Sequence, residues 1–169
     1  VSGNLKEERV RAWQTFATWH PEGALFCFRG GLRSEIAQQW LQHAGVDFPR
    51  IKGGYKAMRR WLIDTSDNFI SNGQLLLVGG PTGAAKTRLL NEGNAGKPIP
   101  GSIDLEGLAN HRGSAFGRRV TEQPTQISFE LAFGAQLVKH RCNGHRKLIL
   151  EDEGRLIGRC ALPLALQSA

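Results

Sequence analysis

The sequence has few cysteines, no long apolar run and no signal-peptide pattern at its polar start. Its cysteines are Cys27, Cys142 and Cys160, an odd number without a C-x-x-C pair. This usage argues against a disulfide framework and against a zinc site, and it fits a reduced, cytoplasmic compartment. No apolar stretch approaches the roughly 20 residues that a membrane-spanning helix needs, so we expect no membrane association.

An initiator methionine is also lacking, since residue 1 is valine, and we therefore expect a piece of a longer protein. The chain has 169 residues, of which 40% are apolar and 22% charged. It can hold one ordinary domain or two small ones around a real core. The net charge of +7 indicates a polyanionic partner, with nucleic acid as the first candidate. A basic protein whose lysines and arginines only solvate its surface is the alternative.

Helical and extended patterns alternate in the first part of the chain. Residues 5–19 carry apolar side chains at helical spacing, and the apolar run 24–28 predicts a short buried strand. A tight basic loop leads into a second helix, for which Ser34 is the expected N-cap and Gly45 the expected stop.

A second strand is predicted at 46–51, followed by a basic helix over 55–63. Residues 64–73 are polar and rich in turn formers, so we place the domain boundary there, with domains at 1–68 and 69–169.

The residue pattern of the second domain predicts the order strand, helix, strand, helix, strand. The elements are a buried strand at 75–78, a helix at 85–91, a short strand at 103–106, a helix at 127–141 and a buried strand at 148–150. This alternation is typical of α/β units with parallel sheets, which is the fold class we predict for both domains.

A phosphate-binding loop is predicted after the strand at 75–78. The pattern is nearly G-x-x-x-x-G-K-[ST], in which Gly80, Gly83, Lys86 and Thr87 are the candidate diphosphate ligands. Ala85 stands where the pattern has its second glycine, and a Cβ disturbs that position if it requires positive φ. A plain glycine-rich turn between strand and helix is the alternative.

Cys27 is the candidate reactive thiol. It ends an apolar run and precedes a loop that carries Arg29 and Arg33. Two guanidiniums, loop amides and the start of a helix all favour a thiolate, and the same groups stabilise a persulfide-like anion. The alternative is a strand cysteine that acts as a small hydrophobic side chain.

Several polar clusters have weaker signals. The acidic strand end at Glu151 is typical of a carboxylate that orients a metal near a phosphate loop, and Asp104 and Glu106 compete for that role. His111 and Arg112 are candidate ligands for phosphate or substrate. Basic clusters at 56–60 and 139–147 either face RNA phosphates or solvate the surface, and the tryptophans at 13, 19, 40 and 61 are expected in the core.

Taken together, these motifs resemble the bacterial tRNA 2-selenouridine synthases. Cys27–Ser34 resembles a rhodanese active-site loop, and Gly53–Ala57 follows near the end of that domain. The phosphate loop, the run Asp104–Gly117 and the run Glu151–Gly158 then complete the family's order of motifs.

The resemblance implies the second half of a rhodanese-like domain followed by a partial P-loop NTPase-like domain. It implies action on 2-thiouridine at the wobble position of tRNA, contacted at the anticodon arm. It further implies that a geranyl group from geranyl diphosphate is attached to the sulfur and that selenium from selenophosphate then replaces the geranylated sulfur. Cys27 matches the selenium-carrying cysteine, and the phosphate loop would hold the diphosphate. A Mg²⁺ ion bound with the diphosphate is compatible with this role.

Two departures from the family follow from the residues. Ala85 replaces a loop glycine, and both domains look cut, which predicts uncovered sheet edges and apolar faces. Two other functions stay open: a P-loop NTPase with a fused rhodanese-like regulatory module, and a tRNA-binding module in which both sites have decayed.

Overall fold

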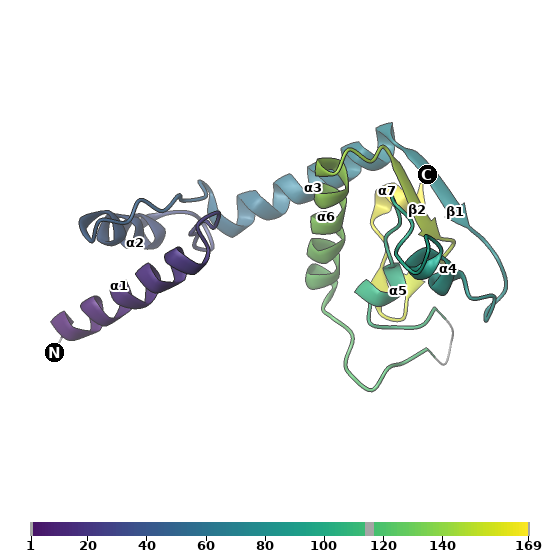
Figure 1. Ribbon diagram of the computed structural model, residues 1–169, viewed down its shortest axis with the longest axis horizontal. Coiled ribbons are helices and arrows are strands. Elements are labelled where there is room, and N and C mark those ends of the chain that lie inside the picture. The colour runs from purple at the N-terminus through teal and green to yellow at the C-terminus, as the bar shows by residue number, and fades with distance from the viewer. Residues whose placement is uncertain (1, 114–116, 169) are drawn as a thin grey trace. The chain divides into compact units, whose positions relative to one another are not determined.

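The computed structural model describes residues 2–113 and 117–168, and Figure 1 shows the course of the chain. The chain divides into two compact units, Val1–Trp61 and Leu62–Ala169. Helix α3, Gly54–Asn72, contains this division as well as the boundary predicted after residue 68. None of the helices in the described part combines the length and the hydropathy that crossing a membrane requires.

The first unit contains helices α1 (Ser2–Trp19) and α2 (Leu32–His43), both predicted from their apolar spacing. Its small core consists of Ala17, Leu41 and Phe48. Trp13 and Trp40 stack beside this core, with their ring centroids 6.3 Å apart. The core placement expected for Trp19 and Trp61 is wrong, because 74% and 55% of their surfaces are exposed.

The two strands predicted in this unit do not form. A parallel bridge joins Leu25 to Arg50, through the hydrogen bonds from Leu25 N to Pro49 O (2.8 Å) and from Ile51 N to Leu25 O (3.0 Å). Phe26 and Phe28 are about half exposed. A strand ladder needs pairing along several residues, and here the two segments pair at one register only.

The polar segment 64–72, predicted as turns, is the second half of α3. Its polar side chains bond to carbonyls one turn earlier in the helix, as in Ser66 Oγ to Leu62 O (2.7 Å) and Asn72 Nδ2 to Asn68 O (3.0 Å). Ile70 packs into the core of the second unit. Side-chain bonds within the helix and burial of Ile70 therefore outweigh the local turn preference.

The second unit is mixed α/β with a parallel sheet, which confirms the predicted class at that level. Strands β1 (Gln74–Val78) and β2 (Lys147–Glu151) pair in parallel, with Leu76 opposite Ile149. Helix α4 (Lys86–Glu92) follows the glycine loop, and α6 (Gln126–Cys142) precedes β2. These are the helices and strands predicted from the sequence.

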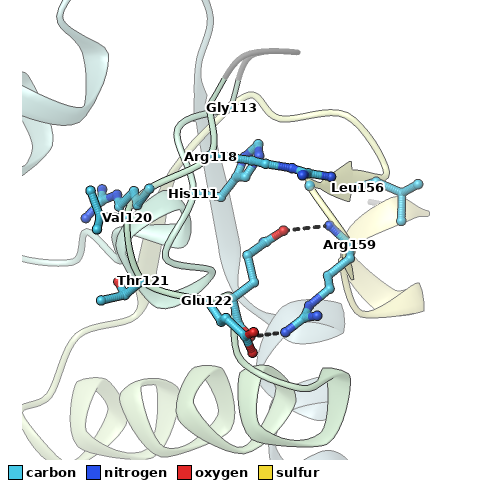
Figure 2. Close-up of a pocket in the computed structure, with 11 residues that line it drawn as sticks. His111, Gly113, Arg118, Val120, Thr121, Glu122, Leu156 and Arg159 are labelled. Atoms are coloured by element: carbon cyan, nitrogen blue, oxygen red, sulfur yellow. Dashed lines mark hydrogen bonds between the residues drawn. The ribbon is translucent and has the colours of Figure 1, made fainter.

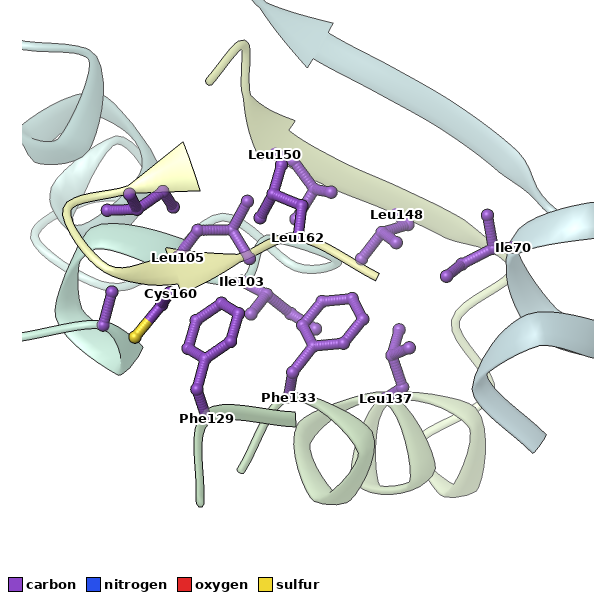
Figure 3. Packing of buried hydrophobic residues seen from close by; sticks show 12 residues of the cluster. Ile70, Ile103, Leu105, Phe129, Phe133, Leu137, Leu148, Leu150, Cys160 and Leu162 are labelled. Atoms are coloured by element: carbon purple, nitrogen blue, oxygen red, sulfur yellow. The ribbon is translucent and has the colours of Figure 1, made fainter. Parts of the chain in front are cut away.

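The core of the second unit lies between α6 and β2. Figure 3 shows Phe129, Phe133 and Leu137 of α6 directed toward Leu148 and Leu150 of β2, and all five are at most 2% exposed. Burying each such side chain contributes about 1.5–3 kcal/mol. The remaining elements are α5 (Leu105–Leu108), the antiparallel pair β3 (Leu156–Ile157) and β4 (Cys160–Ala161), and α7 (Leu164–Gln167).

Two strand predictions in this unit need correction. The segment 103–106 is no strand, because Asp104 caps α5 by accepting from Gly107 N (2.7 Å). Strand β1 exists, but Leu76 and Leu77 are about half exposed and not buried. This agrees with the uncovered apolar faces that the sequence predicts.

Candidate functional site

The Cys27 thiol of the first unit contacts a buried hydroxyl. Its sulfur lies 3.3 Å from Ser34 Oγ, and Ser34 in turn donates to Gly31 O at 2.9 Å. Ser34 is only 2% exposed and lies within the first turn of α2, while Gly31 occupies the N-cap. The N-cap role predicted for Ser34 is therefore wrong, and the serine contacts the thiol instead.

The pKa of Cys27 is lowered to about 7. The largest cause is the hydrogen bond with the Ser34 side chain, which outweighs the raising effect of partial burial. Hydrogen bonds from the backbone of Ser34, Arg29 and Gly31 lower the pKa further. Near neutral pH about half of the thiol is therefore ionised, which is the nucleophilic form.

The anion-stabilising role predicted for Arg29 and Arg33 stays a prediction. Both are exposed, and their guanidiniums are not among the causes that lower the pKa of Cys27. Arg29 contributes through its backbone. Arg33 lines, together with Cys27, a largely apolar cavity of about 610 Å³.

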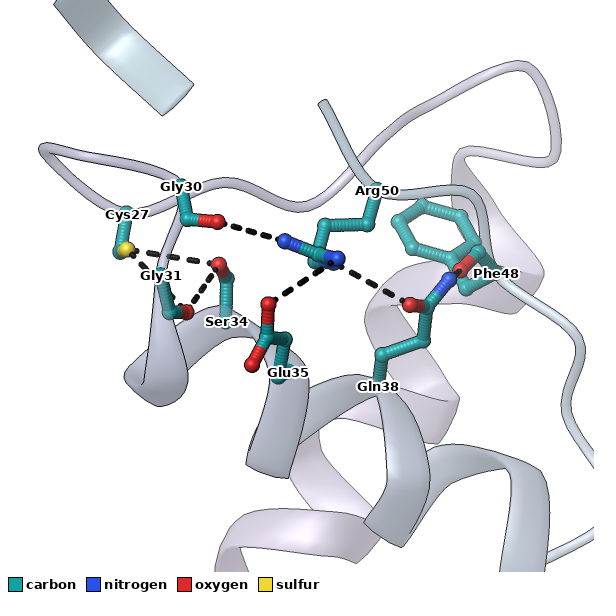
Figure 4. A network of polar contacts seen from close by, with 8 residues as sticks. All are labelled: Cys27, Gly30, Gly31, Ser34, Glu35, Gln38, Phe48 and Arg50. Atoms are coloured by element: carbon teal, nitrogen blue, oxygen red, sulfur yellow. Dashed lines mark hydrogen bonds and ion pairs between the residues drawn. The ribbon is translucent and has the colours of Figure 1, made fainter. Parts of the chain in front are cut away.

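Arg50 is the arginine that fixes the loop, and sequence reasoning missed it. Figure 4 shows its guanidinium between three groups: Gly30 O at 2.5 Å, Gln38 Oε1 at 3.3 Å and Glu35 Oε1 at 3.4 Å. Its side chain is 16% exposed, so these contacts are shielded from water. Because its partners lie 12 to 20 residues away, no local pattern points to this role.

The start of α3 holds the other side of the Cys27 loop. Tyr55 N donates to Cys27 O at 3.0 Å, and Lys56 N donates to Phe28 O at 3.2 Å. Gly54 has φ +60, and a Cβ there would lie 1.9 Å from Cys27 O. Only glycine fits this close approach of two backbones.

The predicted phosphate loop of the second unit connects β1 to α4. Gly83 has φ +87, a value that favours glycine. Lys86 Nζ donates to Gly80 O at 2.8 Å. The lysine is thus folded back over its own loop, so a bound diphosphate would replace the Gly80 carbonyl as its partner.

Ala85 occupies the position that the pattern reserves for glycine, and its φ is +57. A left-handed conformation costs an L-residue with a Cβ roughly 1–2 kcal/mol. From the sequence, we expect a Cβ at this position to disturb the loop if the backbone requires positive φ. The backbone does have positive φ here, so the alanine is strained.

Three carboxylates converge beside the loop. Thr87 Oγ1 lies 3.2 Å from Glu106 Oε2, and oxygens of Glu106, Glu151 and Glu153 lie within 4.8 Å of one another. Glu151 is 3% exposed, and its Oε1 has no hydrogen-bond partner among the described residues. Asp104, the competing candidate, is engaged elsewhere by Asn91 Nδ2 at 2.9 Å.

Burial raises the pKa of Glu151 and of Glu153, and the neighbouring carboxylates add to the effect. A hard cation that prefers oxygen ligands would relieve this repulsion. The three carboxylates therefore fit a Mg²⁺ ion, the cation that we expect from the sequence to be compatible with the phosphate loop. Glu153 was not singled out from the sequence, although it belongs to the acidic run at the end of β2.

The structure also places the other polar clusters singled out from the sequence. His111 lines a basic pocket, whereas Arg112 is exposed. Lys56 of the first basic cluster lies over the Phe28 ring, 5.4 Å from its centroid. In the second cluster, His140 is buried and bonds through Nε2 to Lys147 O at 2.7 Å. Within the run Asp104–Gly117, residues 114–116 lie outside the described residues.

The chain is similar to known proteins over nearly its whole length. Residues 73–169 match the family model described as tRNA 2-selenouridine synthase AAA domain. A tRNA 2-selenouridine synthase of Marinobacter nauticus is 53% identical over 99% of this chain, and one of Hahella chejuensis is also 53% identical over 99%. The chain covers 44% and 43% of these two relatives. No solved structure matches.

Proposed function

The chain belongs to the tRNA 2-selenouridine synthase family, and from this premise we propose that it takes part in modifying the wobble uridine of tRNA. The proposed reaction converts 2-thiouridine to 2-selenouridine through a geranylated intermediate. Geranyl diphosphate and selenophosphate are the co-substrates, the anticodon arm of tRNA is the partner, and the cytoplasm is the compartment. Because the chain spans about 44% of the relatives' length, these statements concern the whole protein's activity.

The observation that carries the proposal is the Cys27 thiol with a pKa of about 7 in its fixed loop. A thiolate at neutral pH is suited to carry selenium as a selanyl group: it would attack the selenium of selenophosphate, so that the S–Se bond forms as the Se–P bond breaks and the phosphorus group leaves as phosphite with the electron pair of that bond. Ser34 and the loop amides, which lower this pKa, would also stabilise a selanyl anion. We propose that the unit holding Cys27 is the rhodanese-like half of the enzyme.

The phosphate loop supplies the second proposed site. Gly80, Gly83, Lys86 and Thr87 would hold the diphosphate of geranyl diphosphate, which leaves when the sulfur attacks the prenyl carbon. The oxygens of Glu106, Glu151 and Glu153 would hold Mg²⁺, whose charge would neutralise the leaving diphosphate. This role needs recognition of a diphosphate and no γ-phosphate chemistry.

Mass spectrometry of the wobble nucleoside tests the proposal. The protein is incubated with 2-thiouridine tRNA, geranyl diphosphate and selenophosphate, and the nucleosides are then separated. We expect Cys27→Ser to abolish selenation and leave geranylation intact, with the exposed Cys142→Ser as matched control. Selenation that persists in Cys27→Ser contradicts the carrier role.

A second candidate is an ATP- or GTP-dependent NTPase with a rhodanese-like regulatory module. The carboxylates around Thr87 favour it, because metal ligands beside a phosphate loop also serve nucleotide hydrolysis. Calorimetric titration separates the two functions. Binding of geranyl diphosphate without ATP turnover supports the transferase, and ATP binding with turnover supports the NTPase.

A further inference from the structure

A basic pocket of about 750 Å³ lies in the second unit, between the described segments 109–113 and 117–123 on one side and the β3–β4 pair on the other (Figure 2). His111, Arg118, Arg119 and Arg159 contribute to its lining, against the carboxylate of Glu122. We call it the arginine pocket. In Figure 2 the Arg118 side chain extends from the His111 side toward the side that carries Leu156 and Arg159.

Hydrogen bonds hold both walls of the arginine pocket in place. The Asn110 amide donates to Thr121 O at 3.1 Å and to Glu122 O at 3.0 Å, which closes the loop at its base. The Gln123 amide donates to Ala109 O and to Ile157 O, each at 3.0 Å, and so ties the loop to β3. These hydrogen bonds hold the residues that they join in place before a ligand binds.

The pocket offers donors that have no partner of their own. Among the described residues, the side chains of Arg118 and Arg119 make no hydrogen bond or ion pair, and both are exposed. His111 is only 5% exposed, yet its Nδ1 has no partner within the same part of the chain. This nitrogen is closed to solvent, so the donors that the pocket offers to a ligand are the exposed guanidiniums of Arg118 and Arg119.

Guanidinium groups select an oxyanion, and phosphate matches the guanidinium fork in two-point contacts. Apolar side chains flank them: Val120 is fully exposed and Leu156 is 61% exposed. A free phosphate ion makes no use of such side chains, whereas a nucleotide presents a ribose and a base beside its phosphate. The lining therefore favours an RNA backbone over an inorganic ion.

The arginine pocket adjoins the phosphate loop through one side chain. Glu106 accepts from Gly113 N, a residue of the pocket lining, and its other oxygen lies 3.2 Å from Thr87 Oγ1. A nucleotide whose phosphate occupies the pocket would therefore lie next to the bound diphosphate.

We propose that the arginine pocket binds a backbone phosphate of the RNA substrate beside its target nucleotide, and so delivers that nucleotide to the phosphate loop. The inference rests on the proposed function for the identity of the polymer as tRNA. Arg118 and Arg119 are the phosphate ligands, and Val120 and Leu156 contact the sugar or base.

Binding of a 2-thiouridine anticodon stem–loop RNA at several salt concentrations tests this assignment. We expect Arg118→Ala/Arg119→Ala to weaken binding about tenfold near 0.1 M salt and to reduce the salt slope by about 1.4, or about 0.7 for each lost contact. The control Arg11→Ala/Arg88→Ala removes the same charge at two exposed sites outside the pocket and should change neither quantity. Thermal unfolding confirms that both variants fold.

Three results overturn the assignment in distinguishable ways. Unchanged RNA affinity and slope in Arg118→Ala/Arg119→Ala refute the pocket while the proposed function stands. No RNA binding by the unsubstituted chain at any salt concentration refutes RNA as the ligand of this pocket, whereas the proposed function of the whole protein fails separately if its wobble nucleoside carries no selenium in the mass-spectrometry assay. Inorganic phosphate is titrated separately into Lys86→Ala, which weakens the phosphate loop. Phosphate binding that disappears when Arg118 and Arg119 are also replaced, with RNA affinity unchanged, assigns the pocket to a free ion and not to RNA.

Discussion

The Cys27 sulfur lies 3.3 Å from the hydroxyl oxygen of Ser34, seven residues later in the chain. This contact is the main reason that the pKa of Cys27 is lowered to about 7. With the thiol protonated, Ser34 donates to Gly31 O at 2.9 Å and accepts from Cys27; its one hydroxyl proton turns toward the sulfur when the thiol ionises.

Replacing Ser34 by alanine should raise the pKa of Cys27 toward the ordinary thiol value of 9.0, because the largest stabilising contact of the thiolate is lost. At pH 7 the rate of alkylation by iodoacetamide should fall several-fold, and the pH profile should shift upward. The measurement uses a Cys142→Ala background, since Cys142 is exposed and would also react. Ser34→Thr, which retains a hydroxyl, should restore part of the reactivity, and an unshifted profile in Ser34→Ala would refute the role of the hydroxyl.

Gly54→Ala should destabilise the loop around Cys27 more than Gly45→Ala does. Both glycines have positive φ, but a Cβ at Gly45 meets open space, whereas one at Gly54 lies 1.9 Å from Cys27 O. We expect Gly45→Ala to cost roughly 1–2 kcal/mol of left-handed strain less about 0.4–1 kcal/mol from the lower freedom of alanine in the unfolded chain, and Gly54→Ala to cost about 1–3 kcal/mol more. Denaturant unfolding measures the two losses, and equal losses would show that the backbone approach carries no extra cost.

Ala85→Gly should stabilise the second unit and strengthen diphosphate binding. The residue has φ +57, and removing its Cβ relieves roughly 1–2 kcal/mol of strain, of which the greater freedom of glycine in the unfolded chain cancels about 0.4–1 kcal/mol. The control is Ala84→Gly, next in the chain and without positive φ, which should destabilise instead. Denaturant unfolding and calorimetry with diphosphate measure both effects, and a loss of stability in Ala85→Gly would contradict the strain.

Glu151→Gln should raise the free energy of unfolding at neutral and alkaline pH. Burial raises the folded-state pKa of Glu151 above its ordinary value of 4.5, so ionising this carboxyl costs folding free energy. That cost is absent below pH 4.5 and grows as the pH rises through the folded pKa.

The difference between Glu151→Gln and the unsubstituted protein should therefore disappear in acid. Asp152→Asn is the control, because that neighbour is exposed. Added Mg²⁺ should raise the melting temperature of the unsubstituted protein more than that of Glu151→Gln. Parallel stability curves at every pH, together with equal responses to Mg²⁺, would contradict the placement of Glu151 in a cation site.

The sequence by itself determined the helices with regular apolar spacing, the parallel strands β1 and β2, and the glycine loop between β1 and α4. It also predicts Cys27, Lys86 and Thr87 as site residues, because those signals lie within short stretches of chain. Hydrophobic period and loop composition are local properties, and local properties can be read without knowing the partners.

Only the tertiary structure decided which distant groups meet. Arg50 reaches Gly30 O across 20 residues, and the Glu106 carboxylate reaches Thr87 across 19. The segment 24–28 has a strand pattern but pairs at one register only, and 64–72 has a turn pattern but continues α3. Pairing, burial and the resulting pKa values depend on neighbours from elsewhere in the chain, and no local pattern specifies those neighbours.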